Sequence, residues 1–167
     1  KEVEYKQVET KLLELQSVIN QQDIKKSKKK LLIFTEARDT LDYLIEKIKS
    51  WGFTTTQIHG LMKMNDRIDA EKEFQNTAQI LIATEAAGEG INLQFCSLMV
   101  NYDIPWNPNR LEQRMGRIHR YGQQEEVFIY NLVAKDTREG SILIRLFEKM
   151  ENMKEKMGSE RVFDVIG

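Results

Sequence analysis

Short apolar runs alternate along this sequence with segments in which apolar residues recur at helical spacing. The first run, Leu31–Phe34, is continuous, which is typical of a strand covered on both faces. The next segment repeats apolar residues every three or four positions through 41–48 and stops at Gly52, a residue type favoured just after a helix. Such alternation with short connections predicts a doubly wound, mainly parallel α/β sheet with helices on both faces.

The same patterns divide the rest of the chain. Further strands are expected at 53–58, 79–83, 97–101 and 126–133, and further helices at 3–19, 65–74 with Asn65 as the N-cap, 109–120 and 142–157. We expect an N-terminal helix (1–24), a basic, solvated linker (25–30), one α/β domain (31–157) and a tail (158–167). Ligands of such sheets bind at the carboxyl ends of the strands. The loops at that edge begin at Thr35, His59, Thr84 and Tyr102.

Composition limits the class of protein. The 25 basic and 26 acidic residues give a net charge of −1, so any grip on nucleic acid must come from a local cluster rather than from bulk charge. One cysteine, Cys96, excludes a disulfide framework and a multi-cysteine zinc site. With no apolar run of membrane-spanning length and no secretory signal, we expect a cytoplasmic protein without a membrane partner. Because the chain begins with Lys1, we also expect it to be part of a longer protein.

The segment 109–123 concentrates positive charge, with four arginines against one glutamate. On a continuous helix Gln113, Arg117 and Arg120 would share one side, with the apolar side chains opposite. Two guanidiniums one turn apart can hold a polyphosphate through forked hydrogen bonds. Gly116, placed inside this helix, suggests close approach of a partner or ligand. The alternative is a surface helix whose arginines are ion-paired.

The segment 84–93 follows an expected buried strand and is rich in small residues. Thr84 can offer a hydroxyl there, and the small residues let a phosphate approach the backbone. A Gly-x-Gly pattern alone is weak, and the alternative is a tight strand-to-helix turn. We interpret His59 as a packed residue rather than a catalyst, and Tyr102 with Trp106 as a rigid packed loop, with base stacking as the lesser alternative.

Two parts of an ATPase are absent from the sequence. It has no Gly-x-x-x-x-Gly-Lys-Ser/Thr phosphate loop and no Asp-Glu pair after a strand to hold magnesium. Glu85 and Glu89 lie about one helical turn apart but lack a partner base. The chain thus carries arginines suited to ATP chemistry and none of the other groups, so we expect that it does not hydrolyse ATP alone.

Taken in order, the motifs resemble those of the second RecA-like domain of superfamily-two helicases. They are Phe34-Thr35, His59-Gly60 with Arg67, Thr84 to Leu93, and Gln113-x-x-Gly116-Arg117-x-x-Arg120. The Swi/Snf group of ATP-driven translocases on double-stranded DNA is the most similar. That similarity is carried by Tyr102–Pro108, by Gln113 and by Arg120-Tyr121-Gly122-Gln123. Glu89 departs from the glycine-rich stretch of many Swi/Snf members and fits bacterial or archaeal relatives better.

The resemblance implies an ATP-dependent DNA helicase or translocase in the full-length protein. Its second motor domain would supply Arg117 and Arg120 as catalytic arginine fingers to ATP and Mg²⁺, which the N-terminal RecA-like domain would mainly bind. By the same resemblance, the nucleotide-binding residues would be Gln113, Gly90 and Asn92, and the nucleic-acid-binding residues would be Thr35, Gly60, Lys63, Thr84 and Glu85. No metal ligand is implied within this chain.

The partners implied are DNA, expected as the duplex, and the N-terminal RecA-like domain of the same protein. In a prokaryote such a protein would be associated with the nucleoid. Two alternatives stay open at this point. One is a non-catalytic nucleic-acid-binding or docking module built on the same sheet, and the other is half of an RNA helicase.

Overall fold

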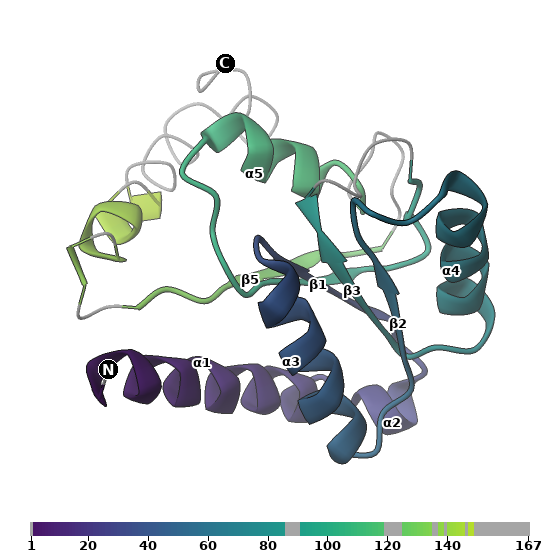
Figure 1. Cartoon of the computed structure of the whole chain (residues 1–167), viewed down its shortest axis with the longest axis horizontal. Helices are drawn as coiled ribbons and strands as arrows, with labels where there is room; N and C mark the ends of the chain where they lie inside the picture. The colour runs from purple at the N-terminus through teal and green to yellow at the C-terminus, as the bar shows by residue number, and fades with distance from the viewer. Residues whose placement is uncertain are drawn as a thin grey trace.

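The computed structural model describes residues 2–85, 91–118, 125–134, 137–138, 140–145 and 147–148. Its elements, in order, are α1 (Glu2–Gln21), α2 (Ile24–Ser27), β1 (Leu31–Thr35), α3 (Arg38–Ser50), β2 (Thr55–Ile58), α4 (Met64–Asn76), β3 (Ile80–Thr84), β4 (Leu98–Asn101), α5 (Pro108–Met115) and β5 (Phe128–Asn131). Five strands form one sheet in the order β2-β3-β1-β4-β5 (Figure 1). All its pairings are parallel, which confirms the predicted sheet.

Two apolar layers cover the sheet. Successive strand residues point to opposite faces, so Leu31 and Ile33 pack against α1 and α3. Leu32 and Phe34 point to the other face and pack in the cluster that contains Phe74 of α4. Burying such side chains stabilises the fold by roughly 1.5–3 kcal/mol each. The predicted continuous apolar strand is therefore covered by helices on both faces.

The two helices that flank β2 begin and end differently from one another. After α3, Gly52 has φ +85°, a conformation that glycine adopts without strain, and the predicted helix stop is confirmed. The N-cap of α4 is Lys63, with no side-chain cap, so the predicted cap at Asn65 is wrong. Lys63 accepts a hydrogen bond from the Arg67 N–H at 3.1 Å, and the helix has therefore already begun when the chain reaches Asn65.

Helix α5 is shorter than predicted. It begins where the Asn107 side chain accepts a hydrogen bond from the Asn109 N–H, and it ends at Met115. The carbonyl of Arg117 accepts a hydrogen bond from the Leu93 N–H at 3.1 Å. The chain after Gly116 is thus held by a distant loop instead of continuing the helix.

The basic stretch, the last helix and Cys96 lie outside the strands. The basic stretch is not only a linker, because it contains part of α2 and because Lys30 donates a hydrogen bond to the Ala78 carbonyl at 2.7 Å. Within the helix predicted at 142–157, residues 142–145 and 147–148 are helical, while 146, 149–157 and the tail lie outside the described residues. Cys96 is buried, its thiol lies 3.2 Å from the Leu98 carbonyl, and burial raises its pKa to about 12.

No helix within the described part of the chain is long and apolar enough to cross a membrane.

Candidate functional site

The parallel register brings the ends of the strands to one edge of the sheet. Thr35 at the end of β1 lies opposite Thr84 at the end of β3, and Ile58 of β2 lies opposite Ala83. In Figure 1 the arrowhead of β3 lies beneath α5, while α1 runs along the far side of the molecule. The loops predicted to carry function therefore start close together, beside α5.

Arg114 lies at the centre of this edge. It is only 2% exposed, and its Nη1 donates to the Asp103 carbonyl at 2.6 Å and to Asn101 Oδ1 at 3.2 Å. Its Nε lies 3.3 Å from Glu85 Oε1 in an ion pair. The guanidinium also lies over the Phe34 ring, 5.2 Å from the centroid. One side chain of α5 thus contacts residues at or just after the ends of β1, β3 and β4.

The charge of Arg114 is compensated mainly by Glu85. Burial lowers the pKa of Arg114, and the Glu85 carboxylate raises it. The guanidinium stays protonated because arginine loses its proton only far above neutral pH. Arg110 adds an exposed ion pair to the same carboxylate, with Nη1 3.1 Å from Glu85 Oε2.

Sequence reasoning missed Arg114, although one signal was present. Arg114 lies three residues after Leu111 and four before Ile118, and both of these are buried. Residues at that spacing share a face of a helix. The position of Arg114 therefore indicated a buried charge with a partner. It was missed because charged residues in a helical pattern are ordinarily assigned to the outer face.

The end of β1 is linked to β4 and to α1 through Asp103. The Thr35 hydroxyl donates to Asp103 Oδ2 at 2.5 Å, and Lys11 Nζ lies 3.3 Å from Asp103 Oδ1. Thr35 is buried, and its hydroxyl is already used inside the protein. Tyr102 beside it is packed, as predicted, but Trp106 is 59% exposed. The interpretation of both aromatic residues as packed is therefore wrong for Trp106.

A second cluster surrounds the loop after β2. His59 is buried, and its Nδ1 lies 3.1 Å from Nη1 of Arg38. Burial, and then the charge of Arg38, lower the pKa of His59, so a neutral ring that accepts this hydrogen bond is favoured. Arg67 donates to the carbonyls of Gly60 at 3.0 Å and Met62 at 3.2 Å. His59 is a packed residue, as predicted, and the arginines fix the loop.

The remaining predicted residues fall into two groups. Gly60, Lys63, Asn92 and Gln113 are exposed, Arg117 and Glu85 are half-buried, and Thr84 is buried. Gly90 and Arg120 lie outside the described residues. The side that Gln113, Arg117 and Arg120 were expected to share therefore cannot be compared with the structure.

The helix predicted at 109–120 is wrong beyond Met115, where α5 ends.

Gly116 differs in its position from what the sequence predicts. It follows the last residue of α5 with an ordinary φ of −62°. A Cβ at this position would make only ordinary contacts, the closest at 3.5 Å to the Glu112 carbonyl. Gly116 therefore does not lie inside the helix as expected, whereas the expected approach of a partner or ligand at this glycine stays a prediction.

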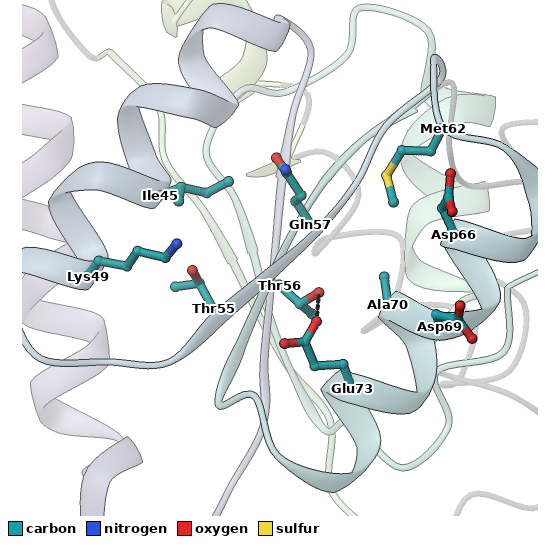
Figure 2. A pocket seen from close by; sticks show the side chains of 10 residues that line it. All are labelled: Ile45, Lys49, Thr55, Thr56, Gln57, Met62, Asp66, Asp69, Ala70 and Glu73. Atoms are coloured by element: carbon teal, nitrogen blue, oxygen red, sulfur yellow. Dashed lines mark hydrogen bonds between the residues drawn. The ribbon is translucent and has the colours of Figure 1, made fainter.

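A separate hollow of about 570 Å³ lies along the outer edge of β2. Figure 2 shows side chains of α3 on one side of β2 and the acidic side chains of α4 on the other. The Thr56 hydroxyl donates to Glu73 Oε2 at 2.7 Å across it. None of the predicted site residues lines this hollow. Among the residues that the structure describes, no group of three or more His, Cys, Asp or Glu could hold a metal ion.

The sequence is similar to a known domain family and to known proteins. Residues 10–122 match the helicase conserved C-terminal domain. The uncharacterized ATP-dependent helicase YqhH of Bacillus subtilis is 48% identical over 135 residues, which are 81% of this chain and 24% of that protein. The human chromatin-remodeling ATPase INO80 is 37% identical over 125 residues, which are 73% of this chain and 8% of that protein. The chain thus spans about a quarter or less of these relatives.

Among solved structures, the C-terminal part of the Fun30 ATPase domain is similar. It superposes with a TM-score of 0.74 at 29% identity and covers 80% of this chain and 44% of that one. The fold implied by the sequence resemblance is therefore confirmed.

Proposed function

Because this chain belongs to the helicase conserved C-terminal domain family, we propose that it is the second motor domain of an ATP-dependent DNA translocase of the Swi/Snf type. The observation that carries the proposal is the position of the arginine segment. Arg117 is joined through its carbonyl to Leu93, so it lies beside the loop that follows β3. Arg117 is thus held at the carboxyl edge of the sheet, where the predicted nucleic-acid-binding residues also lie.

In this proposal ATP binds mainly to the N-terminal RecA-like domain of the full-length protein, with Mg²⁺ on its phosphates. When the two domains close, Arg117 and Arg120 neutralise the charge that develops on the γ-phosphate. An arginine finger of this kind can raise the rate by about 10³- to 10⁵-fold. Gln113, Asn92 and Gly90 then line the nucleotide side of the interface between the domains.

We propose that the loops after β1, β2 and β3 follow the nucleic-acid backbone. Gly60 and Lys63 are exposed, and Arg67 donates to the Gly60 and Met62 carbonyls beside them, so a lysine and an arginine flank this loop. Thr35 and Thr84 end the strands that border the proposed track, and Glu85 follows them as an internal partner of Arg110 and Arg114 rather than as a phosphate contact. Contacts to phosphates do not depend on the base sequence, which suits a motor that must move along any DNA.

The test replaces the two arginines in the full-length protein. We expect Arg117→Ala and Arg120→Ala each to abolish DNA-stimulated ATP hydrolysis, because the γ-phosphate loses its neutralising charge. Folding is followed by circular dichroism. Arg110→Ala is the matched control, since it removes an exposed arginine of the same region. Wild-type turnover in either finger variant would contradict the proposal.

Comparing duplex DNA with RNA as activator separates a DNA translocase from an RNA helicase. A full-length protein that binds nucleic acid without hydrolysing ATP would instead favour the docking module. We expect the 167-residue chain alone to be inactive.

A further inference from the structure

The segment 85–93 is joined to the arginine segment at both of its described ends. At the first end, Glu85 forms ion pairs with Arg114 at 3.3 Å and with Arg110 at 3.1 Å. At the second end, the Leu93 N–H donates to the carbonyl of Arg117 at 3.1 Å. The predicted nucleic-acid residues Thr84 and Glu85 lie at its start, and the predicted nucleotide residue Asn92 lies next to its last residue. The positions of Glu85 and Leu93 relative to α5 therefore bear on how the two proposed sites face one another.

The two arginines that pair with Glu85 differ in burial and in the number of groups that they hold in place. Arg110 is exposed, and its Nη1 donates to one oxygen of the carboxylate at 3.1 Å. Arg114 is buried, forms an ion pair with Glu85, and donates hydrogen bonds to the Asn101 side chain and to the Asp103 carbonyl. A planar guanidinium with several donors holds such partners in one fixed arrangement, which a lysine cannot do.

The carboxylate of Glu85 is also poorly suited to contact phosphate directly. Both of its oxygens face arginines of this chain, and a carboxylate beside a phosphate is repelled by like charge. Its geometry fits an internal contact between β3 and α5 better than a contact with DNA.

We propose that Arg114 is a positioning residue: through Glu85, Asn101 and Asp103 it sets the nucleic-acid edge of the sheet against the segment that carries Arg117. This inference rests on the proposed function. Arg114 itself touches neither ATP nor DNA. Its role is to keep the arginine segment in the arrangement that nucleic-acid contact requires, so that bound DNA stimulates hydrolysis.

The experiment measures ATP hydrolysis by the full-length protein with and without duplex DNA. We expect Arg114→Gln to lower the DNA-stimulated kcat by about tenfold to a hundredfold, because small misplacement of an aligned group costs that much. The KM for ATP should change far less than kcat. Arg114→Lys keeps the charge but not the three contacts, so it should fall between Arg114→Gln and the wild type. Arg110→Gln is the matched control and should keep wild-type stimulation.

Several outcomes would overturn the inference. One is wild-type stimulation in Arg114→Gln or, if that variant does not fold, in Arg114→Lys. Another is an equal rise in KM with kcat unchanged, which would indicate a lost binding contact. Unfolding of both variants, followed by thermal melting, would assign Arg114 a purely structural role. If the wild type shows no DNA-stimulated hydrolysis, the proposed function fails as well. If Arg117→Ala abolishes stimulation while Arg114→Gln keeps it, only this inference fails.

Discussion

Two arginine clusters lie at the carboxyl edge of the sheet, and they treat their charge differently. Around Arg114 a buried cation is compensated by Glu85 and bonded to the ends of neighbouring strands. Around His59, the ring of that residue accepts from Arg38, and Arg67 donates to backbone carbonyls. A carboxylate, Asp42, contacts Arg38 on its exposed side. The first cluster thus buries its central cation between the ends of strands, whereas the second keeps its arginines exposed or half-buried beside the loop after β2.

The comparison predicts its largest effect at Arg114. Replacing it by alanine leaves the Glu85 carboxylate without its buried partner, and breaking a buried pair costs about 3–5 kcal/mol. We expect Arg114→Ala to lower the free energy of unfolding by about 3 kcal/mol, measured by urea denaturation. Arg110→Ala, which removes the exposed ion pair to the same carboxylate, should cost less than about 1 kcal/mol. Equal costs for the two variants would remove the distinction between a buried and an exposed contact.

A smaller loss is expected in the second cluster. Arg67→Ala removes two hydrogen bonds from a half-buried guanidinium to the carbonyls of Gly60 and Met62. Both carbonyls can turn to water, so the cost should be about 1 kcal/mol, again from urea denaturation. Lys72→Ala on the exposed face of the same helix is the control and should change stability little. A loss as large as that of Arg114→Ala would show that the second cluster also holds the fold.

The smallest effect is a pH dependence at His59. Burial and the neighbouring arginines lower its pKa in the folded protein below the usual 6.5. The unfolded chain therefore takes up a proton first as the pH falls. The stability that neutral His59 contributes is fully present above about pH 6.5 and is lost as the pH falls through the lower folded pKa. Unfolding measured at a series of pH values should show a flatter profile for His59→Gln, and identical profiles would contradict this account.

The sheet could be predicted because its determinants are local. The continuous run Leu31–Phe34 needs no partner to be identified as a buried strand, and Gly52 takes a backbone conformation that ends a helix by itself. Parallel pairing then brings the carboxyl ends of the strands to one edge, although it does not fix their order. Thr35 and Thr84 were accordingly expected at one edge, and they lie opposite each other.

The parts that could not be predicted depend on contacts between distant segments. The end of α5 is set where Leu93 bonds the carbonyl of Arg117, and periodicity carries no information about that bond. Arg114 is buried because Glu85 and Asn101 meet it from two strands. A helical pattern can mark its position as core-facing, but only the sheet supplies the partners that make a buried charge tolerable.

Cys96 has a consequence for following the folded state in solution. Its thiol is enclosed in the layer beside α4, and burial raises its pKa to about 12. Alkylating reagents attack the thiolate, so this single thiol is inert while the layer stays closed. The rate at which such a reagent modifies Cys96 therefore reports how often this layer opens in the folded protein.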